Sequence, residues 1–171
     1  MNRRATRAGV AVLMTLSVLV AGCVSGGVPA AVPTPTATVT HGDFDGKPGR
    51  PPPFLVRYDG VELQLAAVTF CTVGPTSGVC ADGSDPNPPS IGSPAEFFVY
   101  VPMAGLDELV VTLSDVTPVD SPGVNAQTKS LGGGWWSVRP AGPSGERAVV
   151  ISATSSHGGG DMIAEVRWQV P

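Results

Sequence analysis

From residue 54 onward, apolar side chains recur at every second position, and this spacing constrains the fold more than any other feature. Alternation of apolar and polar residues is typical of strands that bury one face of a sheet. It runs through residues 55–58, 61–67, 97–101, 109–114 and 149–170, the last being two strands joined by a loop at 155–161. A short strand is also predicted around Trp136 and Val138. No segment beyond residue 22 has apolar residues at helical spacing over three turns, so the sequence predicts an all-β fold.

Turn-forming residues separate the predicted strands. Asp59-Gly60 precedes the second strand, and residues 132–134 are three consecutive glycines. The final strand pair, together with the Pro-Ala-Gly-Pro-Ser-Gly turn at 140–145, resembles the closing strands of bacterial immunoglobulin-like domains. This resemblance implies an immunoglobulin-like β-sandwich of about seven strands over residues 54–171. The chain lacks the inter-sheet cysteine pair of antibody domains, because Cys71 and Cys80 are too close in sequence.

The N-terminus has the organisation of a secretory signal peptide. Three arginines precede an apolar run over residues 9–20, and small residues follow. The alternative, a retained membrane helix, needs about 20 apolar residues, whereas this uncharged stretch has about a dozen. Val20-Ala21-Gly22-Cys23 resembles the lipobox of bacterial lipoproteins. The resemblance implies that residues 1–22 are removed by cleavage between Gly22 and Cys23.

The same resemblance implies that Cys23 carries a lipid, with acyl chains such as palmitate. Two acyl chains hold a protein stably at a membrane. The expected localisation is therefore the extracytoplasmic face of the cell membrane, with the membrane as a partner through Cys23. The mature chain also resembles a class of small lipoproteins from GC-rich bacteria, at Cys71 and in residues 58–63, 80–83, 91–94 and 140–143.

Residues 23–53 are rich in Pro, Thr and Gly and show no apolar periodicity. Proline removes backbone donors, and a segment with little to bury cannot offset its ordering entropy. We therefore expect a disordered tether between the anchor and the β-domain. The threonines at 34–40 are candidates for O-glycosylation. Residues 41–46 interrupt the tether, and we expect a polar linker there rather than a metal site.

Charge excludes some partners and the cysteine count predicts a crosslink. The chain has 10 Lys and Arg against 14 Asp and Glu, and loss of residues 1–22 removes three arginines, leaving 7 against 14. This acidic balance argues against nucleic acid as a partner. With Cys23 lipidated, Cys71 and Cys80 form an even pair in an exported chain, and we expect a disulfide between them. The sequence predicts no metal site and no cofactor.

Two polar clusters have a chemical and a structural interpretation. Ser155, Ser156, His157 and Asp161 suggest a hydrolase, but their spacing is typical of a glycine-rich hairpin loop. His157 is the only histidine expected in the folded domain. Asp82, Asp85 and Asn87 supply oxygen donors that calcium prefers, yet they lack the spacing of a calcium-binding loop and fit a turn next to the disulfide.

Three aromatic residues are the candidate binding residues. Alternation places Phe98 and Tyr100 on the outward face of their strand, and Trp135 faces outward if Trp136 faces the core. Trp135 either packs under the neighbouring loop or joins the other two in an aromatic patch, which would mark an interaction site. The sequence thus predicts a non-enzymatic binding module whose partner is an envelope protein or a cell-wall glycan. A structural accessory subunit of an envelope or export complex is the alternative, and an exported hydrolase comes third.

Overall fold

The computed structural model describes residues 31–43, 49–73, 78–116, 122–155 and 160–171, and every element in these ranges is a strand. The twelve strands are β1 (Ala37–His41), β2 (Phe54–Tyr58), β3 (Val61–Leu65), β4 (Thr69–Val73), β5 (Gly78–Ala81), β6 (Phe97–Tyr100), β7 (Glu108–Asp115), β8 (Val124–Asn125), β9 (Gln127–Gly132), β10 (Trp135–Arg139), β11 (Gly145–Ser155) and β12 (Gly160–Val170). Within the described ranges, no helix has the length and apolar character that crossing a bilayer requires.

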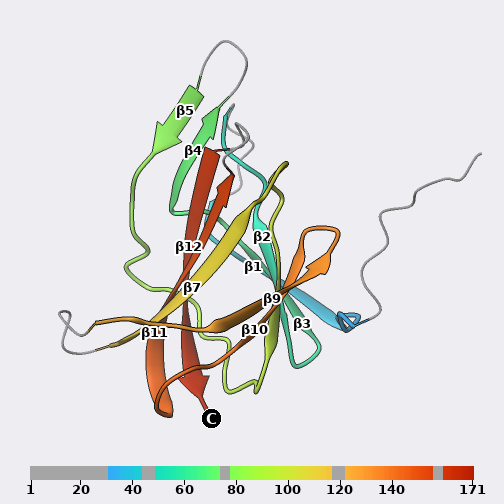
Figure 1. Cartoon of the computed structure of the whole chain (residues 1–171), viewed down its shortest axis with the longest axis vertical. Helices are drawn as coiled ribbons and strands as arrows, with labels where there is room; N and C mark the ends of the chain where they lie inside the picture. Colours follow the sequence, from blue (N-terminus) through green and yellow to red (C-terminus); the bar gives the residue numbers. More distant parts are fainter. Residues whose placement is uncertain (1–30, 44–48, 74–77, 117–121, 156–159) are drawn as a thin grey trace, which may run out of the picture.

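The strands form a β-sandwich of two six-stranded sheets (Figure 1). The first sheet has the order β1-β3-β2-β6-β10-β9, and the second has the order β5-β4-β12-β11-β7-β8. Within them, β2-β6-β10-β9 matches the A-B-E-D order of immunoglobulin domains, and β8-β7-β11-β12 matches C′-C-F-G. The predicted immunoglobulin-like sandwich is confirmed, with more strands than the expected number of about seven because β1, β3, β4, β5 and β8 extend the two sheets.

Alternation along the strands produces the core between the sheets. Val149, Ile151 and Ala153 of β11 are buried, as are Phe97 and Val99 of β6, in the pattern that the sequence predicted. Sheets that pack face to face bury one side of each strand in this way. The largest fully buried side chains are Trp168, Phe54, Phe97, Leu63, Leu65, Ile91, Ile151 and Met162.

The Asp59-Gly60 turn joins β2 to β3 as predicted. Asp59 has a φ of 43° and Gly60 a φ of 79°, the positive values that tight two-residue hairpin turns require. Burial, and to a smaller extent the Asp59 carboxylate, raises the pKa of the Tyr58 hydroxyl at the end of β2. The two-residue length of the Asp59-Gly60 turn fixes the β2–β3 register, which places Val56 opposite Leu63 in the core.

Strand β1 differs from the expected disordered tether over residues 23–53. It pairs in parallel with β3, from Ala37 opposite Val61 to His41 opposite Leu65, and Val32 before it is buried. The ordered domain therefore begins before Phe54, although residues 23–30 and 44–48 of the expected tether lie outside the described residues. The sequence did not indicate β1 because its side chains are largely exposed and give no alternating apolar signal.

Cys71 and Cys80 are joined by a disulfide, which confirms the predicted pair. They lie directly opposite each other in the β4–β5 hairpin, which occupies the end of the molecule away from the C-terminus in Figure 1. The crosslink thus joins the two strands of a hairpin. Beyond this hairpin, the chain returns alongside β12, where Ile91 N–H donates to the Arg167 carbonyl over 2.9 Å.

Gly160 begins β12 at a position where a side chain does not fit. Its φ is 86°, and a Cβ there would overlap the carbonyl oxygen of Cys71. Gly92 has a comparable φ of 70°, but no atom lies within 4 Å of a Cβ placed there.

We expect Gly92→Ala to lower the free energy of unfolding by about 1–2 kcal/mol, the cost of a left-handed alanine. Gly160→Ala should cost about 2–4 kcal/mol because the clash adds to it. Urea unfolding measures both, and equal losses would contradict the clash.

Candidate functional site

The three predicted aromatic residues do share the outer face of the first sheet. Trp135 on β10 lies opposite Tyr100 on β6, and their ring centroids are 5.4 Å apart. Phe98 lies two residues earlier on β6, opposite Ser137. Trp135 is only 3% exposed, whereas Phe98 and Tyr100 are half-buried. Trp135 is therefore buried, against Tyr100 and Arg57 rather than under the neighbouring loop as one alternative had it, and an exposed patch of all three rings does not form.

Trp135 is covered by Arg57 from β2. The Arg57 guanidinium lies 4.5 Å from the centroid of the indole ring, a cation–π arrangement. Glu62 on β3 holds the guanidinium at 2.7 Å, and Arg57 also donates to the Pro33 carbonyl at 3.2 Å. The sequence could not predict that these residues cover Trp135, because they lie about 70 to 100 positions away along the chain. The hollow on this face lies around Phe98 rather than around Trp135.

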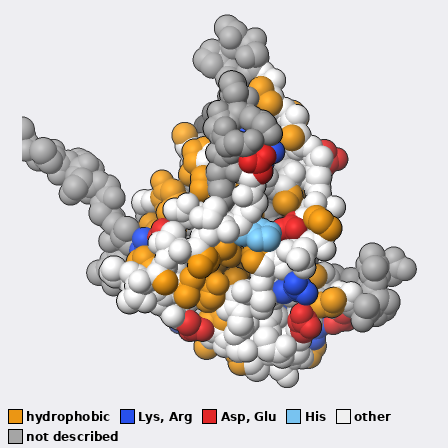
Figure 2. Space-filling model, turned by 180° about the vertical axis from the view of Figure 1, so that it is seen from behind, with side chains coloured by type: hydrophobic (Ala, Val, Ile, Leu, Met, Phe, Trp, Pro, Cys, Tyr) orange, Lys and Arg blue, Asp and Glu red, His pale blue; other side chains and the backbone are white. Residues whose placement is uncertain are grey.

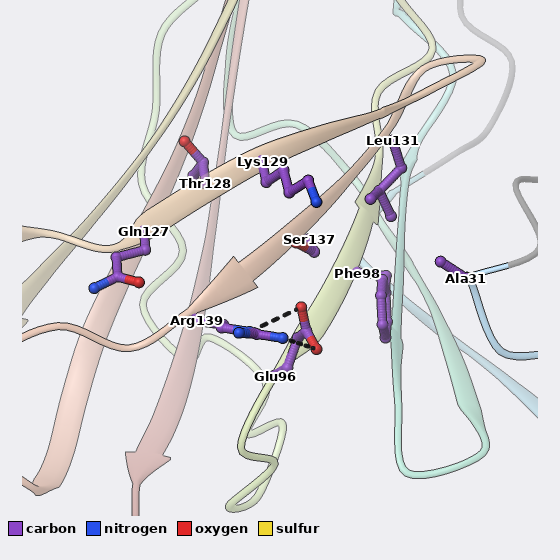
Figure 3. A pocket seen from close by; sticks show the side chains of 9 residues that line it. All are labelled: Ala31, Glu96, Phe98, Gln127, Thr128, Lys129, Leu131, Ser137 and Arg139. Carbon is purple, nitrogen blue, oxygen red and sulfur yellow. Dashed lines mark hydrogen bonds and ion pairs between the residues drawn. The ribbon is translucent and has the colours of Figure 1, made fainter.

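A hollow of about 370 Å³ lies on this face beside Phe98 and is called the first hollow (Figure 3). Pockets that bind small ligands measure about 300–1,000 Å³. Its lining residues come from β6 and the residue before it, from β9 and β10, and from the first described residue of the chain: Glu96, Phe98, Gln127, Thr128, Lys129, Leu131, Ser137, Arg139 and Ala31. It lies over the β6–β10–β9 part of the first sheet, so regular strand pairing positions most of its side chains.

Polar groups surround the Phe98 ring in the first hollow. Arg139 and Glu96 form a two-contact ion pair, with Nε–Oε1 at 3.2 Å and Nη2–Oε2 at 3.3 Å. Figure 3 shows the Phe98 ring edge-on, with Ala31 on one side and this pair together with Ser137 on the other. Lys129 makes no ion pair with any described residue. The hollow therefore carries one uncompensated positive charge around an aromatic surface, an arrangement suited to holding a small polar ligand.

A second hollow, of about 310 Å³, contains a histidine–aspartate pair that the sequence did not indicate. His41 Nε2 lies 2.6 Å from Asp85 Oδ2, and Arg50 also lines this hollow. His41 is the only described histidine, the pale blue side chain in Figure 2. The expectation that His157 is the only histidine of the folded domain is therefore wrong, because β1 brings His41 into the sheet. The β-branched run Thr38-Val39-Thr40 was the available signal for β1.

The candidate calcium residues do not converge. Asp85 Oδ1 accepts the Asn87 backbone N–H at 2.8 Å, while its other oxygen contacts His41. Asp82 instead accepts the Thr69 hydroxyl at 3.0 Å. Nowhere in the described part of the chain do three His, Cys, Asp or Glu side chains gather closely enough to hold a metal ion. Asp85 and Asn87 thus form a turn, which is the structural interpretation that the sequence offered for this segment.

The serine, histidine and aspartate residues of the last hairpin are only partly described. Ser155 ends β11 opposite Gly160, and Asp161 on β12 lies opposite Thr154. Ser156 and His157 lie outside the described residues, as do Gly22 and Cys23. Ser155 and Asp161 therefore have positions in the strand ladder, and the structure brings neither of them to either hollow.

Comparison with known proteins gives no functional assignment. No protein-family model matches the chain, and no curated protein matches it. The features of the molecule that point to a function are the first hollow and the residues around Cys23.

Proposed function

We propose that the mature chain is a lipoprotein, held at the extracytoplasmic face of the cell membrane by acylated Cys23. The support is the arginine-rich start, the short apolar run and the Val20-Ala21-Gly22-Cys23 box. The Cys71–Cys80 disulfide fits the same location, because disulfides persist in oxidising compartments outside the cytoplasm.

The β-sandwich, in this proposal, is a non-enzymatic binding module that uses the first hollow. The observation that carries it is the 370 Å³ hollow with polar groups around the half-buried Phe98 ring. Its single carboxylate, Glu96, is held by Arg139, which positions it to orient a ligand. The partner is an envelope component, either a protein or a cell-wall glycan.

Lipid attachment is tested in cells that produce the full chain. An alkyne analogue of palmitate should label the wild-type protein, and Cys23→Ala should abolish the label because the acceptor sulfur is gone. Cys80→Ala is the matched control, since it removes a cysteine that the lipidation box does not contain, and it should keep the label. An unlabelled wild-type protein, or a labelled Cys23→Ala protein, would refute the anchor.

Use of the first hollow is tested with a photo-reactive amino acid in intact cells. Placed at position 131, inside the first hollow, it should crosslink an envelope component on illumination. The control position is Val124 on the second sheet, which is 44% exposed and lies outside the hollow. Crosslinking at 124 and not at 131 would move the binding surface to the other sheet and contradict the proposal.

A further inference from the structure

The first hollow has the chemistry of a sugar-binding site, and we propose that its ligand is an acidic sugar. The sugar ring lies on the face of Phe98, and its carboxylate lies near Lys129. This inference rests on the proposed binding function and adds the chemical class of the ligand.

The aromatic surface is the first support. Sugar rings have a face of C–H groups that packs against aromatic rings, and a rim of hydroxyls. Phe98 is half-buried, and the face of its ring opposite Ala31 is directed toward the Arg139–Glu96 pair and Ser137 in Figure 3. Aromatic residues supply large contact areas at low entropic cost, which makes them frequent anchors of binding sites. Phe98 can thus act as the platform.

The polar rim is the second support. A ring of hydroxyls needs both donors and acceptors around it, since each hydroxyl is both. Arg139 and Gln127 supply donors, and Glu96 keeps lone pairs beyond its two contacts with Arg139. Arg139 and Glu96 restrain each other through two contacts, so less side-chain freedom is lost when a ligand binds. These groups come from β9, from β10 and from the residue before β6, so the pairing of these three strands keeps their spacing constant.

Charge gives the third support and specifies the class of sugar. The mature chain has 7 basic against 14 acidic residues, yet the hollow contains Lys129 and Arg139 against Glu96 alone. An ammonium without an ion-pair partner favours an anionic group within a few ångströms, and a carboxylate is the acidic group that glycans carry most simply. An added peptide strand would instead pair along the outer edge of β9, and contacts around Phe98 would contribute little to it.

The test compares two disaccharides that differ by one acidic substituent. N-acetylglucosaminyl-N-acetylmuramic acid carries a lactyl carboxylate, and N,N′-diacetylchitobiose has a hydroxyl in its place. Calorimetry or saturation-transfer NMR is performed on the full mature chain in detergent micelles. We expect the acidic disaccharide to bind about fivefold to tenfold more tightly, about 1–1.4 kcal/mol for one charge-assisted contact.

Variants separate stacking from charge. Phe98→Ala should weaken both disaccharides by about tenfold or more. Lys129→Gln should remove the preference for the acidic one and leave the neutral one unchanged. Arg50→Gln removes one positive charge in the second hollow and should change neither, as the matched control. Far-UV circular dichroism of each variant confirms that the sandwich is intact.

Three results would overturn the inference. Equal binding of the two disaccharides would exclude the acidic class, and binding unaffected by Phe98→Ala would exclude this hollow. Binding that appears only when a stem peptide is attached would assign recognition to a peptide. If neither disaccharide binds while position 131 still crosslinks in cells, the sugar class is wrong and the binding module stands. If both fail, the proposed binding function fails as well.

Discussion

Replacing Trp168 by alanine should cost about 4 kcal/mol of unfolding free energy, within the ~3–5 kcal/mol typical of a buried tryptophan. Trp168 on β12 is fully buried, and its ring meets Phe97 edge-on with centroids 4.9 Å apart, which joins the two sheets. Its indole N–H also donates to the Pro94 carbonyl at 3.0 Å, so the truncation leaves a cavity and an unpaired buried acceptor. Because domains are stable by only about 5–15 kcal/mol, this loss is a large fraction of the total unfolding free energy.

Urea unfolding followed by far-UV circular dichroism measures this effect without depending on tryptophan fluorescence. Trp168→Phe keeps an aromatic ring and loses only the N–H and some volume, so about 1–2 kcal/mol is expected. Val124→Ala, on an exposed side chain, should stay within about 0.5 kcal/mol. If Trp168→Ala is too unstable to purify, the Trp168→Phe variant still measures the contribution of the indole N–H and its hydrogen bond to Pro94. A Trp168→Phe protein as stable as the wild type would contradict the role of the Pro94 hydrogen bond.

Removing the disulfide with Cys71→Ser and Cys80→Ser together should lower the unfolding free energy by about 2.5–3 kcal/mol. The two residues are separated by 9 positions, and closing a loop of this size restricts the unfolded chain by that amount in the entropy model. Cys80 is exposed and Cys71 is half-buried, so little packing is lost. The effect should therefore come chiefly from the unfolded state.

Reduction provides the matched comparison. Wild-type protein in dithiothreitol should unfold at the same urea concentration as the double variant, whereas dithiothreitol should not shift the double variant itself. An unchanged midpoint of the wild type on reduction would contradict the crosslink's contribution.

The parts of the fold that sequence predicted are those where one face of a strand is buried. In β6, β7, β11 and β12 the apolar residues alternate because each strand contributes to the core. Strand β1 has no buried face, and β5 is exposed along its whole length, so neither leaves a period-two pattern. Both lie at sheet edges, where pairing with a single neighbour holds the strand.

For the candidate site, the sequence predicted which face of the sheet the side chains point to, and not which of them are buried. Alternation correctly turned Phe98, Tyr100 and Trp135 toward one outer face. The burial of Trp135 depends on Arg57, and the His41–Asp85 contact joins residues 44 positions apart. Such contacts follow from the packing of distant segments, which residue spacing along the chain does not encode.

The parallel pairing of β1 with β3 also sets how far the first hollow can operate from the anchor. Ala31, which lines the hollow, is eight residues beyond Cys23. Under the proposed anchoring, eight residues span at most about 26–29 Å in any conformation, whereas the 31 residues to Phe54 would span roughly 100–110 Å. The volume that the hollow can explore above its anchor shrinks roughly fifty-fold, and its effective concentration toward membrane-proximal ligands rises correspondingly. A hollow anchored in this way would sample the thin layer at the membrane surface rather than the depth of the envelope.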